Sequence, residues 1–95
     1  MQERSPRYST YAAVQMSHRG SVCDALAVDV GQGGICLMGI GGLPMGLVVS
    51  VRHLGLDFEA QVAWSKDLFV GLRFLVPLQP EELDAFRVGP EAWAA

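Results

Sequence analysis

The chain has 95 residues, of which 51% are hydrophobic and 18% charged, and its formal net charge is -3. This length and apolar content predict one folded domain with a modest core and exclude a disordered chain. The acidic balance excludes the global basic field that binds a nucleic acid polymer, and no apolar run approaches the roughly 20 residues of a membrane-spanning helix. We therefore expect a cytoplasmic protein with no nucleic acid polymer as partner and no membrane insertion.

Side chains that form disulfides or bind metals are few. Cys23 and Cys36 cannot build a disulfide framework, and both fall in apolar strand patterns, which is typical of reduced thiols in a cytosolic protein. Neither lies at a metal-ligand spacing from His18 or His53, so we expect no metal site and no cofactor. The sequence also offers no nucleophile–base pair and no carboxylate dyad, which predicts that the protein is not an enzyme.

The N-terminal residues differ in character from those that follow. Residues 1–10 are polar and predict a flexible arm, whereas residues 11–16 alternate loosely as a first strand before a glycine-containing turn at 17–20. We expect the folded domain to span residues 11–89 and residues 90–95 to form a disordered tail.

A glycine turn between two apolar strands lies at the centre of the sequence. Residues 22–30 predict a second strand whose even-numbered side chains, among them Val28, are the more apolar set. Residues 35–38 resume the alternation as a third strand. The intervening glycines predict a tight turn in which the backbone reaches positive φ.

Asp29 lies at the lip of this turn, just before Gly31, Gly33 and Gly34. A carboxylate in this position can cap exposed amides and shape a notch for an oxygen-bearing ligand. In the alternative interpretation Asp29 only closes the hairpin.

The second half of the chain continues as strands. Residues 39–46 contain a G-x-G fragment, but no helical pattern follows it, so we interpret them as a structural loop and not as a phosphate site. Residues 47–52 predict a fourth strand. Residues 56–65 show the clearest alternation, and residues 68–76 return with the same period after a short turn.

The last segment has the period of a helix, expected near residues 80–87. Pro80 suits the first helical position, Glu81 and Glu82 suit the first turn, and glycine and proline at 89–90 end it. Six short strands and one late helix predict a six-stranded antiparallel β-barrel with one short C-terminal helix, because closure removes exposed edges. The expected core consists of Leu26, Val28, Ile35, Leu37, Val49, Val51, Phe58, Val62, Trp64, Leu72 and Phe74, with Leu83 and Phe86 docking the helix.

Three short motifs lie along this predicted barrel. Residues 3–7 read Glu-Arg-Ser-Pro-Arg, residues 29–34 read Asp-Val-Gly-Gln-Gly-Gly, and the late strand pair reads Val-Ala-Trp at 62–64 and Val-Gly-Leu-Arg-Phe at 70–74. Over about residues 3–87 the sequence resembles the PilZ domain family of bacterial signalling modules. That family carries R-x-x-x-R on an N-terminal arm, a D/N-x-S-x-x-G turn, and the strand pair V-x-W and V-G-x-x-F before a C-terminal helix. The resemblance implies a receptor for cyclic di-GMP.

The chain departs from this pattern in two places. Gly31 stands where the family has serine, which removes one neutral hydrogen bond worth roughly 0.5–1.5 kcal/mol. Glu3 stands where the family has its first arginine, and its charge opposes a phosphate. Arg7 matches the second arginine, and Arg4 supplies the first if the arm shifts by one residue.

The resemblance implies a ligand site made of Arg4, Arg7, Asp29, Gly31, Gly33 and Gly34. Arginine can fork two hydrogen bonds to a phosphate or to guanine O6 and N7, the carboxylate can accept from guanine N–H groups, and glycines allow close approach. Trp64 shares its parity with Phe58 and Val62, so we expect it in the core and not as a stacking platform.

Three functions stay open. The chain is a PilZ-like adaptor that binds cyclic di-GMP with weakened affinity and signals to an unidentified protein partner. Alternatively, it is a PilZ-like protein-interaction module that has lost the ligand. A small nucleic-acid-binding barrel is the third possibility, and the acidic balance argues against it.

Overall fold

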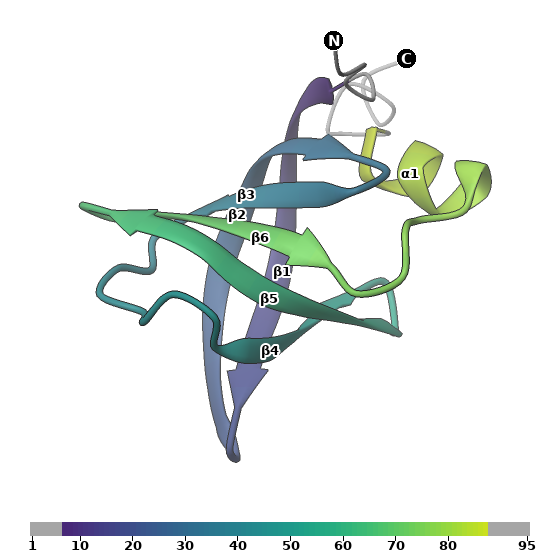
Figure 1. The fold of residues 1–95 in the computed structure, drawn as a ribbon. Helices are drawn as coiled ribbons and strands as arrows, with labels where there is room; N and C mark the ends of the chain where they lie inside the picture. Colours follow the sequence, from purple (N-terminus) through teal and green to yellow (C-terminus); the bar gives the residue numbers. More distant parts are fainter. Residues whose placement is uncertain (1–6, 88–95) are drawn as a thin grey trace, which may run out of the picture.

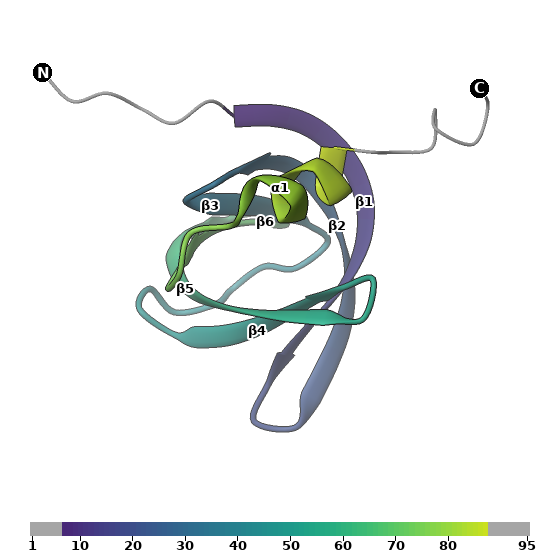
Figure 2. The ribbon, with the colours of Figure 1, turned by 90° about the vertical axis from the view of Figure 1, so that its right-hand side faces the viewer.

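The computed structural model describes residues 7–87, which form six antiparallel strands and one helix (Figure 1). The elements are β1 (Arg7–His18), β2 (Ser21–Gly31), β3 (Gly34–Met38), β4 (Val48–His53), β5 (Leu56–Lys66), β6 (Phe69–Phe74) and α1 (Pro80–Arg87). The strands close into a barrel in the order β1-β2-β3-β6-β5-β4, and α1 lies at one end of it (Figure 2). The predicted fold class is thereby confirmed.

The first strand begins earlier than the sequence predicts. Arg7 pairs with Gly31 and Tyr8 with Val30, so residues 7–10 belong to the barrel and the prediction that they form part of an arm is wrong. The backbone amides and carbonyls of these residues pair with β2, which stabilises the strand. The side chains of residues 7–10 show no clear hydrophobic alternation, so nothing in the sequence indicated this strand. The rest of the predicted arm, residues 1–6, and the predicted tail lie outside the described residues.

Two hairpin turns have the backbone geometry that suits twisted strands. Arg19 and Gly20 join β1 to β2 with φ of 51° and 84°, and Leu54 and Gly55 join β4 to β5 with φ of 53° and 81°. Two consecutive positive φ values are the signature of a type I′ turn, whose twist matches that of the flanking strands. The turn predicted at residues 17–20 is confirmed at Arg19 and Gly20, whereas Ser17 and His18 still belong to β1 and pair with β2.

A β-bulge in β2 decides which of its side chains reach the core. The pairing of β2 with β3 shifts between Ala27 and Asp29, so Ala27 before the bulge and Val30 after it both point inward and are fully buried. Leu26 and Val28, expected in the core, are only half-buried. The even-numbered parity predicted for this strand is therefore wrong before the bulge, where the odd-numbered Ala25 and Ala27 are buried, and holds only after it, at Val30.

A second bulge reverses parity in β5. Its pairing with β6 shifts between Val62 and Trp64; Val62 is buried, whereas Trp64 is 47% exposed and lies on the outer face. The prediction that Trp64 is a core residue is therefore wrong. Phe58 is half-buried and packs against the core. The buried hydrophobic residues are Ala12, Val14, Met16, Ala25, Ala27, Val30, Ile35, Leu37, Ile40, Val49, Val51, Ala60, Val62, Val70, Leu72, Phe74, Leu78, Leu83 and Phe86.

Helix α1 is held to the barrel by its apolar face. Phe86 is fully buried, stacks on His53 with ring centroids 4.1 Å apart, and tilts against Phe58 at 5.8 Å. The Thr10 hydroxyl donates a hydrogen bond to the Phe86 carbonyl oxygen. Leu83 is also buried, which confirms the two predicted docking residues. Within residues 7–87, no helix is long and apolar enough to span a membrane.

His53 is a buried polar residue under this helix, with 7% of its surface exposed. Burial lowers the pKa of its imidazole below the ordinary value of 6.5, so the folded protein holds it neutral. As pH falls below 6.5, the His53 imidazole takes up a proton more readily in the unfolded chain than in the folded one. The free energy of unfolding therefore decreases from that pH down to the lower pKa of the folded state.

Candidate functional site

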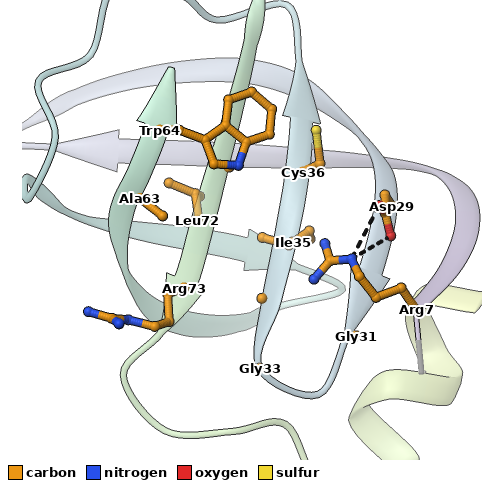
Figure 3. A pocket seen from close by; sticks show the side chains of 12 residues that line it. Arg7, Asp29, Gly31, Gly33, Ile35, Cys36, Ala63, Trp64, Leu72 and Arg73 are labelled. Carbon is orange, nitrogen blue, oxygen red and sulfur yellow. Dashed lines mark hydrogen bonds and ion pairs between the residues drawn. The ribbon is translucent and has the colours of Figure 1, made fainter. Parts of the chain in front are cut away.

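A hollow of about 580 Å³ lies on the outer face of the barrel, over β2, β3, β6 and β5 (Figure 3). Small residues on the two middle strands create it: Cys36 lies opposite Gly71 in register, and Gly34 lies opposite Arg73. Larger side chains rise only at its sides. Its volume falls within the range of roughly 300–1,000 Å³ found for small-molecule sites.

One side of the hollow is an ion pair between the first two strands. Arg7, at the start of β1, donates from Nε to both carboxylate oxygens of Asp29 on β2, over 3.1 and 3.2 Å. Each side chain is 42% exposed, and ion pairs with this much solvent contact contribute only about 0–1 kcal/mol. A ligand can therefore separate them at little cost to the fold.

Trp64 stands at the opposite side, across the hollow from Arg7 (Figure 3). It pairs in register with Gly71, and the indole occupies the space that a side chain there would fill: a Cβ added at Gly71 would overlap the ring. The bulge that removes Trp64 from the core thus places an aromatic surface beside the ion pair. Such a surface can stack on a planar base.

Arg73 on β6 adds a second cation to the lining. Its Nη2 donates to the Oε1 of Gln61 over 3.1 Å, and in Figure 3 its guanidinium points away from the centre of the hollow. The side chain is exposed, so it is free of packing that would prevent it from turning inward.

The glycines of the central turn serve a different purpose from the one expected. Within the described part of the chain, positive φ occurs at other glycines, and Gly31, Gly33 and Gly34 are not among them, so that prediction is wrong. Gly34 is instead a point of close approach between β3 and β6. A Cβ added there would lie 2.6 Å from the Leu72 carbonyl oxygen and 3.6 Å from Nη1 of Arg7.

These two neighbouring glycines should respond oppositely to alanine. Gly34→Ala forces the backbone of β3 away from Leu72, and we expect it to lower the free energy of unfolding by about 1–3 kcal/mol. Gly33→Ala meets no atom within 4 Å and needs no positive φ, so we expect it to be neutral or stabilising by up to about 1 kcal/mol. Urea denaturation of both variants measures the difference, and equal destabilisation would contradict it.

Cys36 lies in the floor of the hollow, opposite Asp29 in register. Burial raises the pKa of its thiol above 9.0, the nearby Asp29 carboxylate raises it further, and Arg7 opposes the shift. The thiol therefore stays neutral and contributes a small apolar surface to the floor. Among residues 7–87, no group of three or more His, Cys, Asp or Glu side chains is arranged to hold a metal ion.

The structure brings together Arg7, Asp29, Gly31, Gly33 and Gly34, five of the residues proposed from the sequence, around one hollow. Arg4 and Glu3 lie outside the described residues. Sequence reasoning missed seven lining residues as site members: Ile35, Cys36, Ala63, Trp64, Gly71, Leu72 and Arg73.

Comparison with known proteins assigns no family to this chain: no protein-family model matches it, and no curated protein matches it.

Proposed function

We propose that the hollow binds cyclic di-GMP and that the chain is a receptor module that relays this binding to a protein partner. The observation that carries the proposal is the placement of the Arg7–Asp29 pair and Trp64 on opposite sides of one hollow with a glycine-rich floor. A dinucleotide with two guanines and two phosphates needs cations, a carboxylate and a stacking surface within a small area.

Each wall suits a different part of this ligand. The guanidinium of Arg7 can fork two hydrogen bonds to a phosphate or to guanine O6 and N7. When Arg7 turns to the ligand, the Asp29 oxygens become free to accept from guanine N–H groups. Trp64 offers a ring face to a base, and Arg73 offers a second cation for the other phosphate.

The floor determines how near the ligand can come. Gly33 is open, with no atom within 4 Å of an added Cβ, so a bulky ligand can approach the backbone there. The lack of a side chain at Gly71 leaves room for the Trp64 indole, which occupies the space that a Cβ there would fill. The open part of the floor therefore lies at Gly33, between the Arg7–Asp29 pair and Trp64.

The second candidate is a protein-interaction module without this ligand. It is favoured by the Arg7–Asp29 pair itself, because the cation already has a counter-charge in the unliganded protein. Gly31 further lacks the hydroxyl that the PilZ pattern places there. Both observations weaken the expected affinity.

Calorimetric titration with cyclic di-GMP at low salt separates the two candidates, and we expect it to show saturable binding. A parallel fluorescence titration uses the Trp93→Phe variant, in which Trp64 is the one tryptophan left, and should show a change in tryptophan emission. Cyclic di-AMP is the matched control, because adenine lacks the O6 acceptor and the N1–H donor of guanine. Absence of binding by the folded protein, or equal binding of both dinucleotides, would overturn the proposal, and the former result would favour the interaction module.

A further inference from the structure

A second groove, of about 370 Å³, lies between the start of β5 and the segment that leads into α1. Its sides come from Leu56, Phe58 and Glu59 on β5 and from Val76, Pro77 and Glu82 after β6. Among the described residues, none lines both this groove and the hollow, so the two are separate sites.

The groove runs along an open edge of β5. Strand β4 pairs with β5 over residues 56–61, whereas the pairing of β6 with β5 begins only at Ala60. On the side away from β4, the Glu59 carbonyl oxygen accepts a hydrogen bond from the Leu75 amide over 3.0 Å. Backbone groups two residues apart in a strand point the same way, so the amide and carbonyl of Asp57 also point away from β4, toward the groove.

Apolar side chains flank this edge without being covered. Leu56 is 53% exposed and Val76 is 74% exposed, and Pro77 is exposed beside them. Phe58 lies at the base of the groove, with its ring against the core. An extended segment can place alternate side chains on such a surface while its backbone pairs with the strand edge.

The charge of the groove is acidic. Glu59 and Glu82 line it, and so does Asp57, which Arg52 holds through two hydrogen bonds of 2.9 and 3.0 Å. Glu82 also accepts a hydrogen bond from the Gln79 amide at the start of α1. Within residues 7–87, no lysine or arginine lines the groove to balance Glu59 and Glu82.

We infer that this groove binds an extended segment of a partner protein in which apolar and basic residues alternate, added as a strand to the edge of β5. The exposed apolar surface of the groove selects the apolar residues of the segment, and the carboxylates of Glu59 and Glu82 select the lysines or arginines between them. A second copy of this chain is a poor complement because its net charge is -3. The inference does not depend on cyclic di-GMP.

The probe is a capped hexapeptide in which lysine alternates with valine, titrated into the ¹⁵N-labelled full chain. We expect amide shifts confined to residues 56–59 and 76–82. A glutamate–valine hexapeptide should bind at least about tenfold more weakly because of charge repulsion. A lysine–valine peptide that is N-methylated at alternate residues keeps the side chains and charge but cannot pair along one edge, so it should also lose at least about tenfold.

Variants of the chain complete the test. Glu59→Lys should weaken binding of the lysine–valine peptide at least about tenfold and strengthen binding of the glutamate–valine peptide. Glu81→Lys is the matched control: Glu81 is an exposed acid beside Glu82 that does not line the groove, so this variant should bind like the wild type. Amide spectra of both variants establish that they fold.

Several results would overturn the inference: shifts outside the groove, equal affinity for the two peptides, unchanged binding after N-methylation, or no binding at all. Shifts of residues 56–59 that depend on protein concentration without peptide would assign the edge to a second copy, which also overturns it.

Discussion

Replacing Phe86 with alanine is expected to lower the free energy of unfolding by about 3–5 kcal/mol. The ring is fully buried, with His53 stacked on one side and Phe58 tilted against it. Its removal leaves a cavity that those rings cannot fill while they remain part of the barrel wall. Because a domain of this size is stable by only about 5–15 kcal/mol, this one side chain accounts for a large share of the stability.

The helix should undock as a consequence. α1 has eight residues, well below the length at which an isolated helix persists in water. Urea denaturation followed by circular dichroism measures the loss. Phe69→Ala is the matched control, because that ring is 39% exposed and its removal should cost less than half as much. Equal costs for the two variants would show that the docking of α1 contributes little.

The regular elements were predictable because their patterns are local. In the first part of β5, apolar and polar residues alternate with period 2, and Ala60 and Val62 are buried as that pattern requires. The start of α1 was also readable, since Glu82 accepts from the Gln79 amide in the way a helix cap demands. Such signals depend on neighbours a few residues apart.

The bulges were not predictable from alternation alone, because one inserted residue reverses every later side chain. In β5 a second signal was present. If the pairs are counted from the hairpin turn between β5 and β6, Trp64 lies opposite Gly71. Position 71 is on the face of β6 opposite to that of Val70 and Leu72. Val70 and Leu72 belong in the core, so Trp64 had to lie outside, and only a bulge reconciles this with a buried Val62.

The site was predictable in part for the same reason. Asp29 and the glycines follow one another in a single turn, so their proximity is local. Arg7 reaches Asp29 through the pairing of β1 with β2, and it was placed there by the motif and not by any periodicity of its own strand. Arg73 reaches the hollow through β6, which pairs with β3 at Gly34. Contacts between strands that distant in the sequence leave no pattern in either strand alone.

Arg7→Ala is expected to weaken binding of cyclic di-GMP at least about tenfold, because one charge-assisted hydrogen bond contributes roughly 1.5–3 kcal/mol. The loss should exceed that of a single contact, since Asp29 then keeps its negative charge without a cation and repels the phosphates. Calorimetric titration of the wild type and the variant measures the ratio. Raising the salt concentration should reduce the difference between them, because screening weakens both effects.

The control is an ion pair of the same kind elsewhere on the barrel. Arg52 donates two hydrogen bonds to Asp57, and its side chain is 56% exposed, against 42% for Arg7. Arg52→Ala removes the same charge from the protein but does not touch the hollow, so binding should stay within about twofold of the wild type. If both variants lost affinity equally, the effect would come from net charge alone, and Arg7 would not contact the ligand. A tenfold loss confined to Arg7→Ala would place the dinucleotide at the Arg7 side of the hollow.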